Sequence, residues 1–403
     1  MGAARGITSR FSQPGYLRVV LVGVLVAQVV VTLVTTTRLW LAPFSTGDWR
    51  TYLSVVQLLK HGRGQLIYDT QTLVVTQSGL GFEQLIYYPY YPAFLLLVYP
   101  FSLLPAGPSF VAWLAFNAGL ILASMWLLAR EFVPRNQRGV FFLLCLTALP
   151  LWLALRIGQS SAFLLLGFSL FAVGWRRGRD WQCGLGLTLL MIKPQLLPIF
   201  GLLLLWRRRR TLLSWAAGAL LLAGLSAWLV GVEGLLAYLH FLLGGARGKQ
   251  YAWSHTLLGL SEVAVGGEHA YLLYGAVAMA TLALSALVMR RSWGAVEQRY
   301  VLALLVLAAL LVANYLLLYD LALWAVPLAL AWPLAVRGRA RYLLAAGYLG
   351  PWLTWLLGDS GVPFPWPTVG LMIVAWAALA GYCWRADRLG NGGAVAEGLV
   401  AGA

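Results

Sequence analysis

Long apolar stretches separated by short polar ones follow one another along almost the whole chain. A helix of about 20 apolar residues crosses the hydrocarbon core of a bilayer, and the stretches between Leu17 and Tyr382 approach or reach that length. The short alternating segments typical of a membrane β-barrel are absent from the sequence. The pattern therefore predicts an all-α, polytopic integral membrane protein. The candidate spans are residues 17–37, 109–130, 139–155, 159–174, 211–232, 270–289, 301–314, 315–334, 341–357 and 366–384.

Two further apolar stretches do not fit a simple crossing. Residues 92–104 are too short to cross comfortably, and residues 182–205 are interrupted by Lys193-Pro194. Proline removes a helical hydrogen bond and kinks or ends a helix, so we expect residues 182–205 to form two half-helices. With these stretches included, the sequence predicts a bundle of about 10–12 transmembrane or half-crossing helices, with further helices in the outward loops.

The composition excludes several classes of protein. Of the 403 residues, 61% are apolar, 29 are Lys or Arg and 13 are Asp or Glu, whereas about a quarter of a soluble domain is charged. A soluble enzyme and a disordered chain are therefore excluded. The three cysteines are scattered, so they predict neither a disulfide framework nor a metal site.

The net charge of +16 does not indicate nucleic-acid binding, because the basic residues form short clusters between apolar stretches. Clusters of this kind are typical of cytoplasmic loops. All of them, with both termini, lie in the cytoplasm if residues 92–104 and 182–205 enter the membrane and return to the same side. If both stretches cross fully, loops 130–138 and 176–179 lie outside instead. We favour the first topology.

This topology also predicts which segments face outward and how the chain is divided. Loops 38–91 and 233–269 lie on the outer side. Residues 1–388 form one membrane-embedded domain. Residues 389–403 contain Gly-rich sequence and are expected to be a disordered tail.

Asp48 is the most informative of the few acidic residues. It follows the first candidate span and begins a stretch with the period of an amphipathic helix. One interpretation is an N-cap residue that starts this helix. The other is a carboxylate at the membrane–water boundary, close in sequence to Arg50, that takes a proton from an acceptor hydroxyl.

Lys193 and Asp320 both lie inside apolar stretches. A charge at that depth costs about 3 kcal/mol or more, so each side chain must face a cavity or a partner. At the end of a half-helix, the Lys193 ammonium can bind an anion such as a phosphate. A Lys193–Asp320 ion pair is the alternative interpretation.

Other polar positions admit both a structural and a functional interpretation. Arg156 and Gln159 interrupt two apolar stretches, where they either bind phosphate and sugar hydroxyls or cap two helices. His255 lies in an outward loop, and Tyr88 belongs to a tyrosine-rich stretch that either marks the interface or stacks on sugar rings. No metal site is predicted, although three carboxylates in the first loop mean that binding of a divalent metal is not excluded. They are Asp48, Asp69 and Glu83.

Taken in order, several short motifs resemble those of glycosyltransferase family 87, a group with the membrane-embedded GT-C architecture that includes the mycobacterial phosphatidylinositol-mannoside mannosyltransferase. The resemblance covers roughly residues 15–385. The motifs are Gly47-Asp48 with Tyr52, Leu66-Ile67-Tyr68-Asp69, Tyr88-Pro89-Tyr90-Tyr91-Pro92, Gly158-Gln159-Ser160, Ile192-Lys193-Pro194-Gln195, Ser254-His255-Thr256 and Tyr319-Asp320-Leu321.

The resemblance implies an inverting transferase of a bacterial-type inner membrane that acts in glycolipid or cell-envelope synthesis. It implies transfer of a sugar, often mannose, from a polyprenyl-phosphate co-substrate to a lipid-linked or glycan acceptor at the outer face, with no other cofactor. Asp48 occupies the position of the family's catalytic aspartate. We expect the donor phosphate to be bound by Lys193, Arg156 and Arg50. We expect the sugar and acceptor to be oriented by Gln159, His255, Tyr319, Asp320 and Tyr88.

A transporter or flippase for a lipid or small polar solute is the alternative function. Lys193 and Asp320 would then be gating or substrate-binding charges within the membrane. The two functions differ in their dependence on Asp48, because only a transferase requires a first-loop carboxylate for turnover. The transferase also requires Asp48 and Lys193, which are far apart in sequence, to meet on the outward side.

Overall fold

The computed structural model describes residues 19–20, 22–30, 34, 47–82, 85–243, 253–336, 345–357 and 366–390. These residues form α-helices, short 3₁₀ turns and one π-helical turn, and they contain no β-strand. The predicted all-α fold is therefore confirmed. Part of the first candidate span, most of the predicted tail and residues 337–344 lie outside the described residues.

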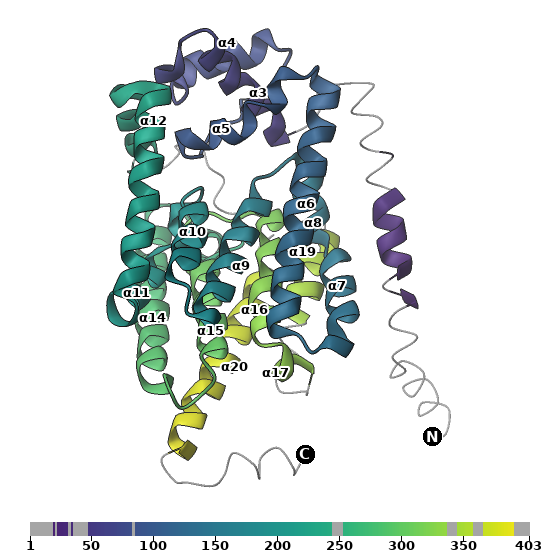
Figure 1. Cartoon of the computed structure of the whole chain (residues 1–403), viewed down its shortest axis with the longest axis vertical. Helices are drawn as coiled ribbons and strands as arrows, with labels where there is room; N and C mark the ends of the chain where they lie inside the picture. Colours follow the sequence, from purple (N-terminus) through teal and green to yellow (C-terminus); the bar gives the residue numbers. More distant parts are fainter. Residues whose placement is uncertain are drawn as a thin grey trace.

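Four of the described helices are long and apolar enough to cross a membrane. They are α6 (Ala106–Phe132), α12 (Arg209–Leu243), α14 (Gly267–Ser292) and α20 (Trp366–Gly390). A bent pair, α7 (Arg138–Leu146) and α8 (Leu149–Ile157), makes a fifth crossing if its two halves, inclined by 53°, count as one span. Helices α12 and α6 stand upright on opposite flanks of the bundle in Figure 1, which agrees with a multi-pass membrane protein.

Shorter helices fill the space between the long ones. They are α9 (Ser161–Arg177), α10 (Asp180–Leu190), α11 (Pro198–Arg207), α13 (Leu257–Val265), α15 (Gln298–Val312), α16 (Ala325–Leu330), α17 (Trp332–Val336) and α19 (Gly350–Leu357). A π-helical turn, Ala345–Leu349, precedes α19. Helix α15 is almost completely buried, so it forms the centre of the bundle.

The stretch 315–334 does not form the single helix expected from its apolar composition. Residues 313–317 are irregular, and the 3₁₀ segment η7 (Leu318–Trp324) follows before α16 begins. The buried Asp320 explains this break, because its side chain accepts a hydrogen bond from the backbone N–H of Leu317 instead of facing lipid. The irregular backbone is shielded by protein, which is the condition for such backbone at membrane depth.

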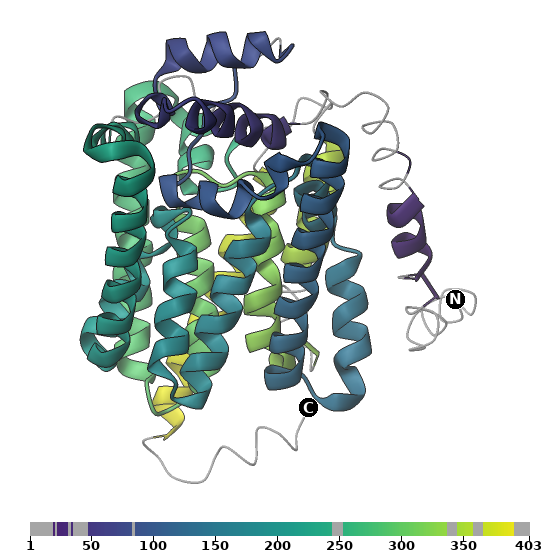
Figure 2. The same cartoon turned by 45° about the horizontal axis from the view of Figure 1, so that its top comes forward.

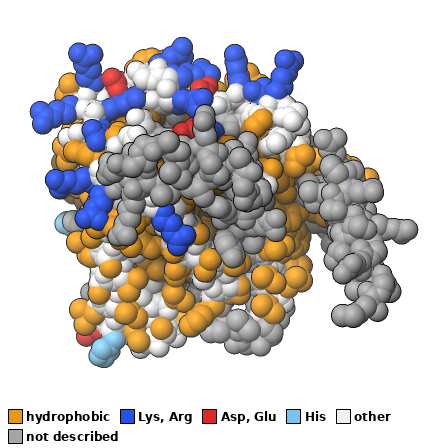
Figure 3. Space-filling view, turned by 90° about the horizontal axis from the view of Figure 1, so that it is seen from below, with side chains coloured by type: hydrophobic (Ala, Val, Ile, Leu, Met, Phe, Trp, Pro, Cys, Tyr) orange, Lys and Arg blue, Asp and Glu red, His pale blue; other side chains and the backbone are white. Residues whose placement is uncertain are grey.

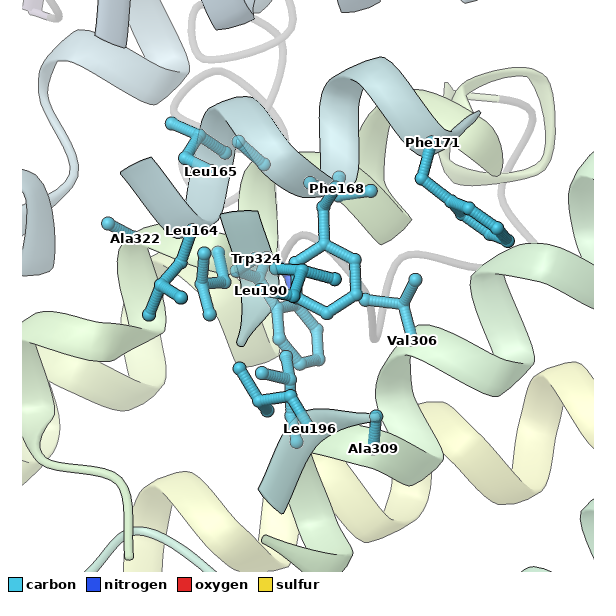
Figure 4. Packing of buried hydrophobic residues seen from close by; sticks show 14 of the residues in the cluster. Leu164, Leu165, Phe168, Phe171, Leu190, Leu196, Val306, Ala309, Ala322 and Trp324 are labelled. Atoms are coloured by element: carbon cyan, nitrogen blue, oxygen red, sulfur yellow. The ribbon is translucent and has the colours of Figure 1, made fainter. Parts of the chain in front are cut away.

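Residues 180–207 form the predicted re-entrant hairpin. Helix α10 ends near the turn η5 (Pro194–Leu196), and α11 runs back. The two ends of the hairpin meet, because an Arg208 guanidinium nitrogen lies 3.8 Å from an Asp180 carboxylate oxygen. The proline of Lys193-Pro194 cannot continue the helical ladder, so the chain turns there. The hairpin tip is packed inside the bundle. Leu196 of the tip belongs to the same buried apolar cluster as Phe168 (Figure 4).

The segments predicted to face outward lie together at one end of the bundle. Helices α3 (Gly47–Lys60) and α4 (Thr70–Gly79) lie across this end, above the upright helices (Figures 1 and 2). The predicted non-crossing residues 92–104 form only short turns beside them. These are η2 (Pro92–Phe94), α5 (Leu95–Val98) and η3 (Phe101–Leu103).

The opposite end carries the arginine clusters. Helices α6, α9, α11 and α14 all end in basic residues there, as the positive-inside pattern requires. Figure 3, seen from that end, shows Lys and Arg side chains gathered over part of the face beside a wide apolar area. The Glu131 carboxylate forms ion pairs with two of these arginines, Arg176 at 3.0 Å and Arg177 at 2.6 Å.

Candidate active site

Asp48 lies in the first turn of α3, where the helix contacts the bundle. The neighbouring Gly47 packs against Ile157 of α8, whose side chain would lie 3.4 Å from a Cβ on the glycine. Asp48 is half-buried, but its Oδ2 is shielded from solvent and has no hydrogen-bond partner among the described residues. Burial raises the pKa of Asp48 from 3.8 to about 7. A carboxylate with this pKa is suited to accept a proton near neutral pH.

Lys193 and Asp320 form a buried ion pair. The Lys193 Nζ lies 2.7 Å from Asp320 Oδ1 and 2.6 Å from Oδ2. Ser161 Oγ donates a second hydrogen bond to Oδ1 at 2.9 Å, and the Leu317 N–H donates to Oδ2 at 3.0 Å. The ion pair that sequence analysis offered as an alternative is therefore present. It satisfies the buried carboxylate and fixes the position of the ammonium.

The structure brings this pair to Asp48. The Lys193 ammonium is close enough to lower the pKa of Asp48, and the Asp320 carboxylate is close enough to raise it. Both effects are smaller than that of burial. Three charged groups from α3, the hairpin tip and η7 thus share one site at the end of the bundle opposite the arginine clusters.

Gln159 lies beside this site in the turn between α8 and α9. The turn depends on Gly158, whose φ of 73° is a left-handed conformation that glycine adopts without strain. The Gln159 Oε1 accepts hydrogen bonds from Tyr90 Oη at 2.7 Å and from the Ser160 N–H at 3.1 Å. Because Oε1 accepts both of these hydrogen bonds, the amide NH₂ of Gln159 points away from Tyr90 and Ser160 and toward Tyr319 of η7.

Aromatic rings surround the first turns of α3. Tyr52 makes edge-to-face contacts with Tyr88 at 6.4 Å and with Tyr90 at 5.4 Å between ring centroids. Trp49 stacks on Trp113 at 5.1 Å. Tyr88 is fully buried in this cluster, and Tyr319 places its ring 5.6 Å from the Lys193 ammonium. The rings exclude water from the carboxylate, which accounts for the raised pKa of Asp48.

His255 is buried in a loop that is pinned to the segment before η7. Its backbone N–H donates to the Leu316 carbonyl at 2.7 Å, and the Ser254 hydroxyl accepts from the Leu316 N–H at 3.0 Å. Burial lowers the pKa of His255 from 6.5 to about 3. The imidazole is therefore neutral at physiological pH, so it can orient a hydroxyl but cannot supply a positive charge.

Two of the predicted phosphate ligands are placed less directly. The Arg50 guanidinium lies 5.0 Å from the centre of the Phe82 ring. Arg156 is exposed on α8, and within the described residues no hydrogen bond or ion pair joins it to Lys193. The roles of Arg50 and Arg156 at a phosphate stay predictions.

The first-loop carboxylates do not assemble as one group. Asp69 is the N-cap of α4 and accepts a hydrogen bond from the Thr72 N–H at 2.8 Å. Glu83 lies outside the described residues. Among the residues described, no three His, Cys, Asp or Glu side chains are grouped to hold a metal ion.

Sequence analysis missed two residues that complete the site. Ser161 supports Asp320, and Tyr90 orients Gln159. Both follow or lie within motifs already singled out, but the sequence does not show which hydroxyl of a Ser-Ser or Tyr-Tyr pair points inward.

The fold and site define a multi-pass membrane protein with a buried acid–cation site at one end of its helical bundle. Its family is shown by a match to the model of "Glycosyltransferase family 87" over residues 88–319. The chain belongs to this family, as the order of its motifs predicted, and it is a membrane glycosyltransferase.

A solved structure is also similar to the chain. ArnT from Cupriavidus metallidurans in the apo state has 16% sequence identity and a TM-score of 0.35, with 89% of this chain and 77% of that chain covered. A similarity of this size has no bearing on the site. No curated protein matches the chain.

Proposed function

We propose that the protein is an inverting glycosyltransferase that moves a sugar, mannose by preference, from a polyprenyl phosphate to an acceptor hydroxyl. The acceptor is a lipid-linked sugar or a glycan at the outer face of a bacterial-type inner membrane, and both termini are cytoplasmic. The observation that carries the proposal is the shielded Asp48 carboxylate beside the Lys193–Asp320 pair. One group can accept a proton while the other supplies a positive charge.

Asp48 is proposed as the general base. The acceptor oxygen attacks the anomeric carbon of the donor, its proton passes to Asp48, and the bond from that carbon to the phosphate oxygen breaks. A base is most effective when its pKa lies near the working pH, because it is then ionised often enough and still binds the proton well. A pKa of about 7 meets this condition.

Lys193 is proposed to stabilise the phosphate as it leaves. The ammonium is fixed by Asp320, so it does not have to be reorganised when charge develops on the leaving oxygen. Only 7% of Lys193 is exposed, and a shielded charge acts more strongly than one in water. Arg50 and Arg156 are proposed to add positive charge for the donor phosphate.

The remaining polar residues are proposed to orient the sugar. Gln159 and Tyr319 present an amide and a hydroxyl beside the ion pair, and the neutral His255 presents an imidazole from the loop pinned to the same segment. Asp320 holds the Lys193 ammonium, and Tyr88 packs against Tyr52 in the aromatic cluster; both are proposed to face the sugar or acceptor. Positioning of this kind lowers the barrier by holding reacting atoms in line.

The test is a transfer reaction with purified protein. Incubation with polyprenyl-phosphate mannose and membrane lipid extract should yield products heavier by one hexose in mass analysis. Asp48→Asn should lower turnover at least about 100-fold, the usual contribution of a general base. Glu268→Gln, at an exposed carboxylate in the first turn of α14, is the matched control and should not change turnover. Equal turnover by Asp48→Asn, or solute uptake without any hexose addition, would contradict the proposal.

A further inference from the structure

A pocket of about 490 Å³ lies away from Asp48, where the C-terminal end of α3 and the turn η1 (Gly64–Leu66) meet α12. Its volume is within the range of sites that bind small molecules. Nothing in the transfer mechanism uses it. Its lining includes Leu59, Gly62, Gln65, Leu229, Gly231 and Glu233.

Much of the pocket wall is accessible backbone. Gly231 interrupts α12 with a φ of 70° and a ψ of 175°, and Gly62 has a φ of 69°. A Cβ added to either glycine would meet nothing within 4 Å, so both face open space. A break in a helix leaves N–H and C=O groups without their helical partners. Backbone donors and acceptors are therefore offered to a ligand at this break.

The side chains at the pocket have both polar and apolar character. Glu233 offers a carboxylate and Gln65 an amide, and both residues are exposed. Leu59 and Leu229 add an apolar surface. Hydrogen-bonding groups of both kinds next to an apolar wall match the faces of a sugar ring, which carries hydroxyls at its edge and C–H groups on its faces.

A phosphate fits this pocket less well than a neutral sugar. The only ionisable residue in its lining is the acidic Glu233, whose charge repels an anion. Three basic residues close in sequence, Lys60, His61 and Arg63, are not part of the lining. Lys60 and His61 each bind a backbone carbonyl, at 2.9 Å and 2.7 Å. The chemistry of the lining thus favours an uncharged, hydroxyl-rich ligand.

The pocket lies along α3 from the candidate base. Leu59 follows Asp48 by 11 residues, which is about 16 Å of helix at 1.5 Å per residue. We propose that the pocket is a distal subsite for the acceptor glycan. It would bind a sugar unit several units away from the one whose hydroxyl reacts. This proposal rests on the transferase function proposed above. It makes the enzyme select elongated acceptors over short ones.

Direct binding of mannotriose to the purified, detergent-solubilised chain tests the subsite without requiring turnover. Glu233→Gln should weaken mannotriose binding about tenfold, the loss expected for one hydrogen bond to a charged group. Glu268→Gln is the matched control and should bind like the wild type. Gln65→Trp, which places a large ring at the pocket, should weaken binding at least as much.

The outcomes separate this proposal from the transferase function. Asp48→Asn protein should still bind mannotriose in a Glu233-dependent manner, whatever its turnover. Equal affinity of the wild type and both pocket variants would overturn the subsite. Displacement of mannotriose by inorganic phosphate, with tighter phosphate binding in Glu233→Gln, would also overturn it, because the pocket would then be an anion site.

Discussion

Asp48 bears an electrostatic cost that its neighbours do not remove. Burial raises its pKa, and the opposing effect of Lys193 is partly cancelled by Asp320. The ionised form is therefore less stable in the folded protein than in the unfolded one. This cost is absent below about pH 4, where the carboxyl is protonated in both states, and is fully present above about pH 7. A residue that destabilises the fold at working pH is typical of a functional site.

We predict that Asp48→Asn raises stability while it removes activity. Thermal unfolding in detergent should show a higher Tm for the variant at pH 8 and no difference at pH 4, because the cost disappears when the wild-type carboxyl is protonated. Wild-type turnover should rise with pH through about 7 as the base form accumulates. A lower Tm for Asp48→Asn at pH 8 would instead assign Asp48 a structural role, such as capping α3.

The Lys193–Asp320 pair leads to a second prediction. Asp320→Asn leaves a buried ammonium without its counter-charge and should destabilise the protein by about 3–5 kcal/mol. The double variant Lys193→Met with Asp320→Leu replaces the pair by apolar groups and should recover most of that stability, as measured by chemical unfolding. Turnover should stay low in both variants because the ammonium is unpaired in one and absent in the other. If Asp320→Asn were as stable as the wild type, the ion pair would not contribute to the stability of the fold.

The sequence predicts which residues are chemically unusual better than it predicts how they meet. A carboxylate or ammonium inside an apolar stretch is visible at once, and Lys193 and Asp320 were singled out in this way. Asp48 was singled out because it follows the first candidate span and begins an amphipathic stretch. Their meeting depends on tertiary folding that brings together residues up to 272 positions apart in the chain. Arg156 was singled out by the same criterion, yet it is exposed, because one turn of α8 decides which way a side chain points.

At the scale of elements, helices α9 and α10 pack backbone against backbone. A Cβ on Gly186 would lie 2.5 Å from the Gly167 carbonyl oxygen, and one on Gly167 would lie 2.8 Å from the Gly186 oxygen. Lipid tails are as apolar as leucine, so helices in a membrane associate through close packing of small residues rather than through burial alone. This contact positions the hairpin that carries Lys193.

We predict that Gly186→Ala destabilises the protein by about 1–3 kcal/mol, since the new methyl group meets backbone atoms that cannot yield. Gly201→Ala on α11 is the matched control, because a Cβ there meets nothing within 4 Å. Alanine in a helix interior is otherwise more favourable than glycine, so the control should be neutral or stabilising. Thermal unfolding of the two variants checks this, and a stabilising Gly186→Ala would contradict the close contact.

Element boundaries were predicted well where apolar periodicity is continuous and poorly where a polar residue redirects the chain. Helices α6 and α14 were expected within three residues of their ends. Helices α12 and α20 begin where expected but continue to Leu243 and Gly390, beyond the predicted ends at 232 and 384. The stretch 315–334 was expected as one helix, since its composition is uniformly apolar apart from Asp320. The partners of Asp320 break it, and those partners come from elsewhere in the chain.

At the scale of the whole molecule, charge and site lie at opposite ends of the bundle. The arginine-rich ends of α6, α9, α11 and α14 lie at one end, and α3 with Asp48 lies across the other (Figure 1). If the arginine end is cytoplasmic, as basic loops generally are, the site faces outward. The orientation of the enzyme in its membrane thus decides on which side the glycosylated product accumulates.

This orientation predicts the result of labelling intact cells with a membrane-impermeant maleimide. A cysteine at Gln65, exposed beside η1, should be labelled, whereas one at Arg179, exposed between α9 and α10, should be labelled only after the cells are lysed. The three native cysteines are buried, so background labelling should be low. The reverse pattern would place the site in the cytoplasm.

The ion pair between Lys193 and Asp320 joins residues that are 127 positions apart. A ribosome adds about 5–20 residues per second, so the lysine is made about 6–25 s before its aspartate. During that interval the hairpin tip has an ammonium in or near the bilayer with no counter-ion from its own segment. The newly made hairpin therefore has to wait at the aqueous boundary, or beside the insertion machinery, until the late helices arrive. The order of translation thus makes this pair a final step of maturation, and a chain truncated before η7 would be expected to leave its hairpin undocked.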